Sequence, residues 1–455
     1  MSNRIWVDVE DLFEYARANA RPSGIQRLAF EICRALVASE GDRVRFVRHA
    51  GAAASFRIVP WAVVAAMFET LTAAEAPGST LPDLIEPHGA ARQSLRKLVY
   101  RLPPALRVAV VEAAQASAQA AAAWARVPRT AAAARRRTEE RVAPADGGDP
   151  DIGFDASTAG DVLLAPGAPW GHPDYAALIA AQRARGIRFA LLVYDIIPLR
   201  RPEWCQPGLV RIFRTWLPAI LPQCDRVFAI SQATAADVRA YAARHAVALQ
   251  GPVTPIPIGT GWTQAASPGS KRPDLPEPGT YALIVSTIEV RKNHVLLFRI
   301  WRRLLEELPP ERVPTLVFAG RVGWLTGDLV QQIVNAEYLD GKIVVLQNPS
   351  DADLAALYCG CLFTLFPSLY EGWGLPVTES LAFGKPCLIS NLTSLPEAGG
   401  DLARSFDPDN LNEAYGKIRE AIEDRTGLAA WEATIREDFV PVPWSATAQA
   451  LIDAL

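Results

Sequence analysis

Residues 368–386 read Ser-Leu-Tyr-Glu-Gly-Trp-Gly-Leu-Pro-Val-Thr-Glu-Ser-Leu-Ala-Phe-Gly-Lys-Pro, and they lead from a predicted strand into a predicted helix. The apolar run Cys361–Phe366 comes just before and predicts a buried strand, while Pro376 suits the first turn of a helix. Two carboxylates, Glu371 and Glu379, flank the glycine-rich turn between them. Backbone N–H groups at such a helix start attract anions, whereas the carboxylates suit a neutral hydroxylated group beside the anion. The stretch therefore predicts a site for phosphate and sugar together.

The composition is that of a globular protein with more than one domain. The chain has 455 residues, half of them apolar and 21% charged, so we expect two or three domains. A net charge of -3 gives no sign of nucleic-acid binding. Because we find neither a signal-peptide core nor a Cys-x-x-Cys pair, we expect a cytoplasmic protein with reduced cysteines. The Asp-x-Asp triplets at 149–151, 351–353 and 407–409 lie among turn-forming residues, so we expect no metal site.

Short apolar runs alternate with helical patterns along the chain, which predicts α/β layers with parallel sheets. The predicted strands are Ile5–Val9, Val44–Val47, Val162–Ala165, Phe189–Tyr194, Val227–Ile230, Tyr281–Val285, Thr315–Ala319, Ile343–Leu346, Cys361–Phe366 and Cys387–Ser390. We interpret the Pro- and Gly-rich stretch 251–279 as a linker between two domains, 1–270 and 271–430. The segment 431–455 is expected to hold a C-terminal helix that crosses back to the first domain.

Residues 88–145 form a basic, Ala/Arg-rich insertion in the first domain. They contain eleven Arg and Lys residues and three Glu, so their net charge is +8 and that of the remaining chain is -11. One interpretation is a surface, through 92–141, that lies on anionic lipid. The other is a solvated insertion without a partner, because charge runs are usually solvated faces. Both interpretations stay open.

Arg291 and Lys292 follow the predicted strand Tyr281–Val285 and precede a predicted helix. An arginine forks onto phosphate oxygens and a lysine supplies a point charge, so this pair suits a diphosphate. Stabilising a departing nucleotide diphosphate is mainly electrostatic work. Together with Glu371, which suits sugar hydroxyls, and Glu379, which suits a ribose diol, the pair predicts a nucleotide-sugar site in the second domain.

The first domain offers weaker candidates. Gly24 opens a predicted helix and allows a ligand to approach the backbone closely; the alternative is an ordinary capped helix. Asp195 ends a predicted strand, where a carboxylate faces the ligand side of an open α/β sheet; a turn-forming Asp is the alternative. Tyr194 precedes it, and Trp170 with His172 follows another predicted strand. We predict that these three line an acceptor pocket, with Trp170 stacking on a sugar.

The chain resembles retaining nucleotide-sugar glycosyltransferases of the GT-B fold, glycosyltransferase family 4. The resemblance rests on the Glu-x7-Glu signature Glu371–Glu379, on Glu289–Asn293 and on Ser23–Arg27. It covers the first forty residues and the chain from about 185 to its end, but not 88–145. It implies an α/β protein with two Rossmann-like domains whose parallel sheets face a central cleft. It also implies metal-independent transfer with no cofactor besides the nucleotide-sugar donor.

The resemblance also implies roles for single residues. Arg291 and Lys292 bind the diphosphate, and Glu371 positions the donor sugar. The orientation of a hydroxyl by Asp195 is expected from its place at a strand end and not from the resemblance. The other donor-binding residues are Gly24, Thr287, Gly372, Trp373, Gly374, Leu375 and Glu379. Ser286-Thr287 stands where many members have Gly-Arg, which gives more of the phosphate binding to Arg291 and Lys292. Tyr194 stands where many have a histidine before the aspartate.

We therefore expect a retaining hexosyltransferase of bacterial surface polysaccharide assembly. Its donor is a nucleotide-diphosphate sugar, with GDP-mannose as the first candidate, and its acceptor is a glycan or a lipid-linked oligosaccharide. The expected location is cytoplasmic, with peripheral attachment to the inner face of the cell membrane. Two alternatives stay open: a GT-B-like nucleotide-sugar epimerase or hydrolase, and a non-catalytic nucleotide-sugar binding protein.

Overall fold

The computed structural model describes residues 3–19, 21–50, 55–73, 157–172, 174–261, 272 and 274–455. The described residues belong to one compact unit that holds two separate β-sheets. The basic insertion 88–145, with the predicted lipid surface at 92–141, lies outside the described residues.

The first sheet is built from the first half of the chain and has the strand order β3-β2-β1-β4-β5-β6-β7 in the described residues. Its strands are β1 (Ile5–Asp8), β2 (Val44–Ala50), β3 (Ser55–Val59), β4 (Val162–Ala165), β5 (Arg188–Val193), β6 (Arg226–Ala229) and β7 (Val253–Pro255). All pairs are parallel except β2 with β3. The helices are α1 (Glu10–Ala18), α2 (Gly24–Glu40), α3 (Trp61–Ala73), α6 (Tyr175–Ala184), α7 (Ile197–Arg200), α8 (Pro207–Ile220) and α9 (Gln232–Arg244).

The second sheet is parallel throughout, with the order β10-β9-β8-β11-β12-β13. Its strands are β8 (Tyr281–Val285), β9 (Thr315–Ala319), β10 (Ile343–Leu346), β11 (Thr364–Phe366), β12 (Cys387–Ser390) and β13 (Arg404–Phe406). The helices of this half are α10 (His294–Glu307), α11 (Gly327–Asn335), α12 (Glu337–Asp340), α13 (Asp351–Gly360), α14 (Leu375–Ala382), α15 (Leu395–Gly399), α16 (Leu411–Glu423) and α17 (Arg425–Asp438), and the chain ends with α18 (Trp444–Ala454). The predicted α/β class with two parallel-sheet domains is confirmed.

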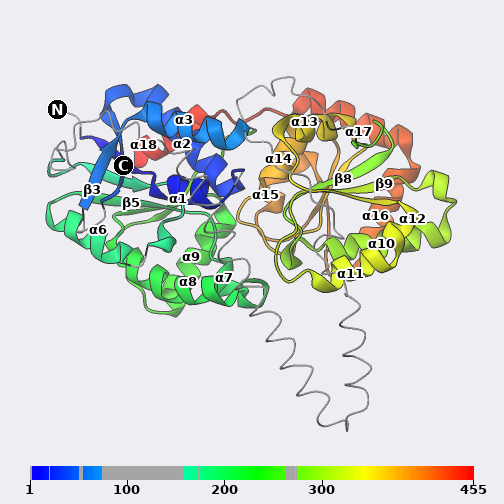
Figure 1. Ribbon diagram of the computed structural model, residues 1–455, viewed down its shortest axis with the longest axis horizontal. Helices are drawn as coiled ribbons and strands as arrows, with labels where there is room; N and C mark the ends of the chain where they lie inside the picture. The colour runs from blue at the N-terminus through cyan, green and yellow to red at the C-terminus, as the bar shows by residue number, and fades with distance from the viewer. Residues whose placement is uncertain are drawn as a thin grey trace, which may run out of the picture. The chain divides into compact units, whose positions relative to one another are not determined.

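Strands of the first sheet are apolar on both faces because helices cover both faces (Figure 1). Successive residues of β1 show this: Ile5 and Val7 pack with residues of α2 and α18, whereas Trp6 packs with residues of α6 and α8. Side chains alternate between the two faces of a strand. Continuous apolar runs are therefore what a doubly covered parallel sheet requires.

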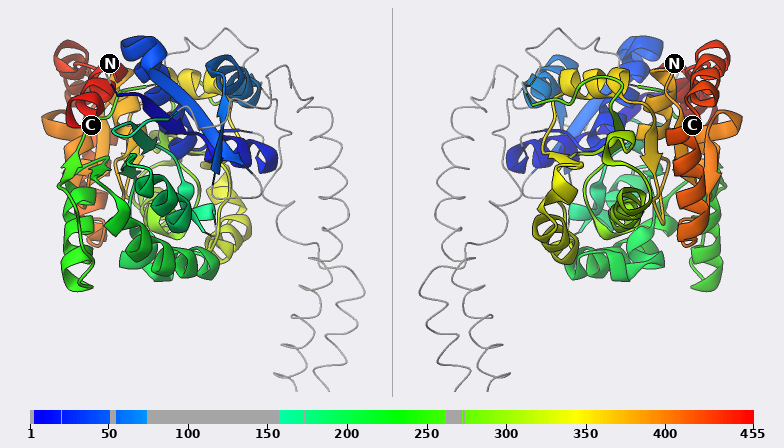
Figure 2. Two further views of the ribbon diagram at one scale, coloured as in Figure 1. Left: turned by 90° about the vertical axis from the view of Figure 1, so that its left-hand side faces the viewer. Right: turned by 90° about the vertical axis from the view of Figure 1, so that its right-hand side faces the viewer.

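Helix α18 follows the whole second sheet in sequence, yet it packs against α2 of the first sheet. Figures 1 and 2 show α18, in red, beside the blue α2. Its Trp444 ring fills the space next to Gly259, where a Cβ atom would lie 2.2 Å from the ring. The C-terminal helix thus completes the core of the first sheet.

All ten predicted strands are present, with ends that shift by at most three residues. Three strands were not predicted. Strand β7 lies inside 251–279, so the interpretation of that whole stretch as a linker was wrong. Strand β13 has two exposed residues of three, and β3 is the antiparallel strand at the sheet edge, so neither gives the pattern of a buried parallel strand.

Candidate active site

The two predicted donor motifs meet at the carboxyl edge of the second sheet. Arg291 and Lys292 lie in the 3₁₀ turn η7 (Val290–Lys292) that follows β8, and Glu371 lies in the loop that follows β11. Strands β8 and β11 are neighbours in the sheet. Parallel neighbours end at the same edge, so residues 79 and 80 positions apart in sequence come into contact.

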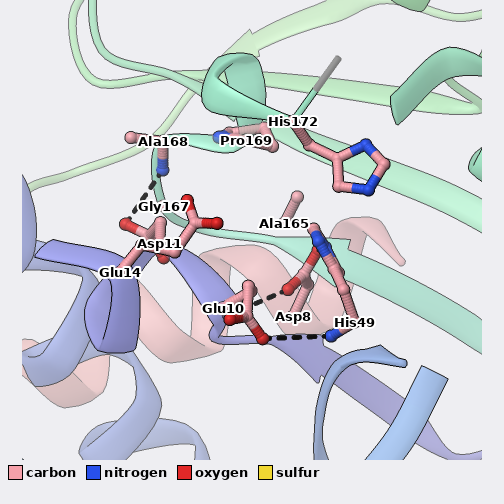
Figure 3. A pocket seen from close by; sticks show the side chains of 10 residues that line it. All are labelled: Asp8, Glu10, Asp11, Glu14, His49, Ala165, Gly167, Ala168, Pro169 and His172. Atoms are coloured by element: carbon pink, nitrogen blue, oxygen red, sulfur yellow. Dashed lines mark hydrogen bonds and ion pairs between the residues drawn. The ribbon is translucent and has the colours of Figure 1, made fainter. Parts of the chain in front are cut away.

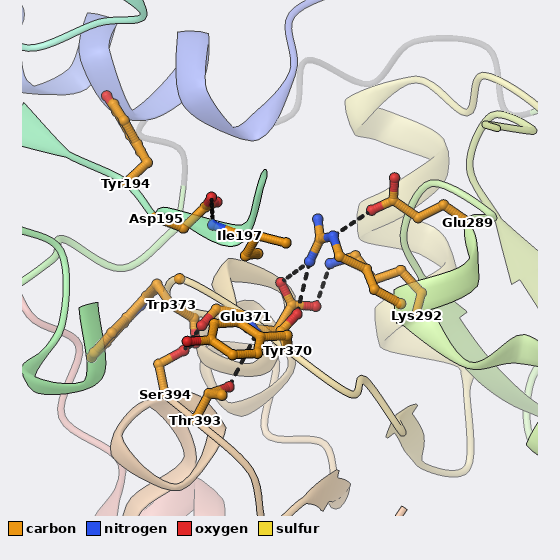
Figure 4. Close-up of polar contacts among 12 residues, drawn as sticks. Tyr194, Asp195, Ile197, Glu289, Lys292, Tyr370, Glu371, Trp373, Thr393 and Ser394 are labelled. Carbon is orange, nitrogen blue, oxygen red and sulfur yellow. Dashed lines mark hydrogen bonds and ion pairs between the residues drawn. The ribbon is translucent and has the colours of Figure 1, made fainter. Parts of the chain in front are cut away.

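Glu371 forms ion pairs with both cations (Figure 4). Its Oε2 accepts a hydrogen bond from Arg291 Nη1 at 2.7 Å, and its Oε1 accepts one from Lys292 Nζ. The backbone N–H of Glu371 donates to Thr393 Oγ1 at 3.0 Å, and Ser394 Oγ donates to the Glu371 carbonyl at 3.0 Å. The loop after β12 therefore fixes the loop that carries Glu371.

These charges decide the protonation of the group. Burial alone would raise the pKa of Glu371, but the Arg291 and Lys292 charges outweigh it and lower that pKa to about 2. For Lys292, burial and the adjacent Arg291 charge lower the pKa. Burial also disfavours the Arg291 cation, yet Glu371 and Glu289 raise its pKa overall. At neutral pH Glu371 is therefore an ionised acceptor of hydrogen bonds.

Two more carboxylates complete the arrangement. Glu289 Oε1 pairs with Arg291 Nε at 2.7 Å, and we call Glu289, Arg291, Lys292 and Glu371 the ion-pair cluster. Glu289 belongs to the quoted motif but was not predicted as a site residue. Asp195, which follows β5, accepts a hydrogen bond from Ile197 N at 3.0 Å. Burial raises the pKa of Asp195, and the nearby Arg291 charge opposes that rise.

The start of α14 is shaped by two glycines for different reasons. Gly374 has φ +114°, a backbone conformation that side chains rarely adopt. Gly372 lies against the carbonyl oxygen of Tyr194, so its size is set by packing on the first half of the chain. At Gly24, a Cβ atom would lie 3.6 Å from Leu375 Cδ1. The first residues of α2 and α14 are thus neighbours, as a shared donor site requires.

Two predicted donor residues lie in other surroundings. The Trp373 side chain packs against the core of the first sheet, and its buried Nε1–H has no partner among the described residues. Thr287 is half-buried in the loop after β8, and its Cγ2 would lie 2.8 Å from a Cβ atom on Gly323. Neither side chain forms a hydrogen bond with the ion-pair cluster within the described part of the chain.

Glu379 is buried in α14 and accepts a hydrogen bond from the Tyr358 hydroxyl at 2.9 Å. Burial raises its pKa to about 7, although Tyr358 and the Arg27 charge act in the opposite direction. Arg27 of α2 also pairs with Asp351 at 2.5 and 2.9 Å. Sequence reasoning interpreted Asp351 as a turn former and missed this pair, because its two members are 324 positions apart.

The predicted acceptor residues are not brought together. Tyr194 is 4% exposed, and its hydroxyl donates to the Pro166 carbonyl. The Trp170 ring packs on Phe213 and Trp216, with centroids 5.1 and 5.7 Å away. Both side chains therefore contribute to the hydrophobic cores of the first sheet. The predicted roles of Tyr194 and Trp170 in an acceptor pocket have no support in this arrangement.

His172 does line a polar pocket, at the carboxyl edge of the first sheet (Figure 3). The pocket is lined by Asp8, Glu10, Asp11, Glu14, His49, Ala165, Gly167, Ala168, Pro169 and His172. The His172 ring lies edge-on to His49, with centroids 4.6 Å apart, and His49 Nε2 is 2.9 Å from Asp8 Oδ2. Burial lowers the pKa of His49, but the Asp8 hydrogen bond and charge raise it overall.

The pocket and Asp195 share one sheet edge. Asp8, His49 and Ala165 stand at or near the ends of β1, β2 and β4, and Asp195 follows β5, the next strand in the sheet. Neighbouring strands lie about 5 Å apart. The pocket is thus one to a few strand spacings from Asp195.

Within the described residues, no group of three or more His, Cys, Asp or Glu side chains is arranged to hold a metal ion. No helix in those residues is long and apolar enough to span a membrane.

The two parallel-sheet halves define a GT-B fold, which this chain shares with solved structures of low sequence identity. One of them is Anabaena Alr3699/HepE in complex with UDP and glucose, with a TM-score of 0.53 and 15% identity, covering 100% of this chain and 99% of that chain. Residues 270–438 match the family described as Glycosyl transferases group 1.

The chain is also similar to two mannosyltransferases of Escherichia coli. It is 30% identical to the serotype-specific mannosyltransferase WbdA over 300 residues, and these aligned residues cover 62% of this chain and 35% of the relative. It is 36% identical to the O-antigen chain mannosyltransferase B over 144 residues, and these aligned residues cover 32% of this chain and 37% of the relative. The chain thus spans about a third of the length of these curated relatives.

Proposed function

We propose that the protein is a retaining hexosyltransferase that moves a hexose from a nucleotide-diphosphate sugar to a hydroxyl of a glycan or lipid-linked acceptor. The observation that carries the proposal is the ion-pair cluster at the carboxyl edge of the group 1 glycosyltransferase domain. Similarity to proteins named mannosyltransferases supports mannose as the hexose. GDP-mannose is therefore the first donor to test, for a role in surface polysaccharide assembly.

Arg291 and Lys292 are the groups that would bind the diphosphate. A phosphate oxygen competes with the Glu371 carboxylate for the same N–H donors. As the bond between the anomeric carbon and the phosphate oxygen breaks, negative charge grows on the leaving diphosphate, and the two cations stabilise it. Two positive charges at this place support transfer that does not depend on a metal ion.

Glu371 would position the donor sugar rather than transfer a proton. With a pKa of about 2 it is ionised at neutral pH, so it has no proton to give to a leaving group. The acceptor oxygen forms its new bond to the anomeric carbon on the face that the phosphate leaves. Because the new bond forms on the face from which the phosphate departs, the configuration is retained, and the acceptor proton passes to the departing phosphate oxygen. Glu379 would accept hydrogen bonds from the ribose diol.

The pocket that contains His172 supports the edge of an acceptor site, because its own volume of about 10 Å³ holds no more than a water. Its carboxylates and imidazoles are hydrogen-bonding groups that suit hydroxyls, and it shares a sheet edge with Asp195. On this proposal Asp195 orients the attacking hydroxyl. Attachment to the inner face of the membrane through 92–141 stays a prediction.

A panel of nucleotides and nucleotide sugars, read by thermal shift, tests the donor site first, because ligand binding to the native state raises stability. We expect a nucleotide-diphosphate sugar to raise the melting temperature of the wild type but not that of Lys292→Ala. Product analysis with donor alone separates transfer from its alternatives. Rapid epimerisation or stoichiometric hydrolysis without acceptor would favour the epimerase or hydrolase, and tight binding without turnover across many acceptors would favour the binding protein.

A further inference from the structure

The Glu289 carboxylate is hydrogen-bonded through one oxygen only. The side chain is 3% exposed, and its Oε1 pairs with Arg291 Nε at 2.7 Å. Its Oε2 is buried and accepts no hydrogen bond from any residue that the structure describes. A buried carboxylate oxygen without a donor is costly, because the lost hydration is not replaced. Such an atom in a site calls for a functional explanation.

In Glu371, by contrast, both carboxylate oxygens accept hydrogen bonds. Its two oxygens accept from Arg291 Nη1 and Lys292 Nζ, and the Ser368 side chain adds a further hydrogen bond. A carboxylate has about four acceptor positions in all. Three of these positions are taken, so one is left, and Glu371 can accept hydrogen bonds from two hydroxyls of a donor sugar only if at least one cation leaves it.

Lys292 can leave Glu371 for the diphosphate. Arg291 can leave Glu371 for a second carboxylate, Glu289. The Arg291 guanidinium contacts both carboxylates, because its Nε pairs with Glu289 and its Nη1 pairs with Glu371. Arg291 Nη1 also donates to the Tyr370 carbonyl at 3.0 Å. Arginine prefers to bind a carboxylate through two parallel N–H groups. A small rotation of the guanidinium toward Glu289 would place a second nitrogen at Oε2 and would free Glu371 Oε2.

We infer that Glu289 is a positioning residue: it takes over Arg291 when the donor binds and so releases Glu371 for the sugar hydroxyls. This role rests on the proposed function. Because Arg291 moves from Glu371 to Glu289, the site binds a sugar nucleotide in preference to the nucleotide without its sugar. The competing charge of Glu289 keeps Arg291 from staying locked on Glu371. Without the Glu289 charge, Arg291 would stay bound to both Glu371 and the diphosphate. Glu371 could then not accept hydrogen bonds from the sugar hydroxyls.

The test compares Glu289→Gln, Glu289→Ala and wild type by calorimetric titration with GDP and with GDP-mannose, and with the UDP pair. The removal of a negative charge should leave the affinity for the nucleotide diphosphate unchanged or higher. The affinity for the sugar nucleotide should fall, so the ratio of the two dissociation constants should change by about tenfold. Glu289→Asp, which keeps the charge, should restore part of the ratio. Glu432→Gln removes a carboxylate from another ion pair of the same half, with Lys385 at 3.0 Å, and should leave the ratio unchanged.

An unchanged ratio in Glu289→Gln and Glu289→Ala would overturn the inference, as would an equal loss of affinity for both ligands, which indicates a structural role alone. The ratio is a binding measurement, so it tests Glu289 without an acceptor. Failure of the proposed function is a separate result, in which wild type binds sugar nucleotide but transfers no sugar. Where transfer is measured, kcat should fall in Glu289→Gln more than KM rises.

Discussion

Gly372 lies directly against the backbone of Tyr194: a Cβ atom at 372 would lie 2.2 Å from the Tyr194 carbonyl oxygen. Thr234 Oγ1 donates to that oxygen and to the Gly372 carbonyl oxygen, at 3.2 Å each. The first glycine of Gly-Trp-Gly is therefore required by contact with the strand end that carries Asp195. The loop of Glu371 and the loop of Asp195 are built against each other.

Gly372→Ala should separate these two loops, because backbone atoms cannot move aside as a flexible side chain can. We expect a lower melting temperature and a loss of sugar-nucleotide affinity of about tenfold or more, measured by thermal shift and calorimetry. Gly416→Ala is the matched control. Gly416 lies in α16 with open space around its Cβ position, and alanine should stabilise that helix by roughly 0.5–1 kcal/mol. Equal behaviour of the two variants would contradict the assigned contact.

Glu379→Gln should change how stability depends on pH. The Glu379 carboxyl has its pKa raised from 4.5 to about 7, so the native state holds its proton longer than the unfolded chain does. Stability from this group is complete below about pH 4.5 and is lost as pH rises through about 7, by up to roughly 3 kcal/mol. Glutamine stays neutral and avoids that loss.

Denaturant unfolding of wild type and Glu379→Gln at several pH values measures this difference. The free energy of unfolding of the variant should rise relative to that of wild type between about pH 5 and pH 8. Above that range the difference between the two should be constant. A difference in stability that does not depend on pH would show that Glu379 ionises normally.

Trp170→Ala should lower stability, because the Trp170 ring packs on Phe213 and Trp216. Removal of a large aromatic side chain from a core costs about 3–5 kcal/mol, and less where it is partly exposed. Trp170→Phe, which keeps a ring, should recover much of that loss. An acceptor KM that rises in Trp170→Ala while stability stays unchanged would restore the sugar-stacking role.

Glu14→Gln tests the pocket on the first sheet. Glu14 is exposed and lines the pocket, so the substitution removes an acceptor of hydroxyl hydrogen bonds without loss of core packing. The KM for the acceptor should rise several-fold, with donor affinity unchanged. Glu311→Gln, on an exposed turn outside the pocket, should alter neither constant. Equal KM values for the two variants would place the acceptor elsewhere.

The strands of both sheets could be predicted because parallel strands covered on two faces carry continuous apolar runs. Strand β7 could not, since Val253–Pro255 is three residues long and lies in a stretch rich in Pro and Gly. The donor motifs could be predicted because glycines, cations and carboxylates recur at the ends of particular strands. Their direct pairing could not, because side-chain contact depends on which strands are neighbours.

The first-domain predictions fared differently for a similar reason. Tyr194 and Asp195 are adjacent in sequence, yet Tyr194 turns into the core and Asp195 lies near Arg291. The alternation of side chains at a strand end separates them, and the last residue of the strand has to be known before either can be placed. His49 and Asp8 of the pocket gave no motif, because they stand on different strands and meet only in the folded sheet.

The central claim is that Arg291, Lys292 and Glu371 bind a nucleotide-diphosphate sugar. Calorimetric titration of wild type, Lys292→Ala and Glu371→Gln with the sugar nucleotide that gives the largest thermal shift tests it most directly, with circular dichroism to show that each variant is folded. We expect Lys292→Ala to lose about a hundredfold or more in affinity for the nucleotide and its sugar conjugate. Glu371→Gln should lose affinity only for the sugar conjugate. Wild-type affinity in both folded variants would contradict the claim.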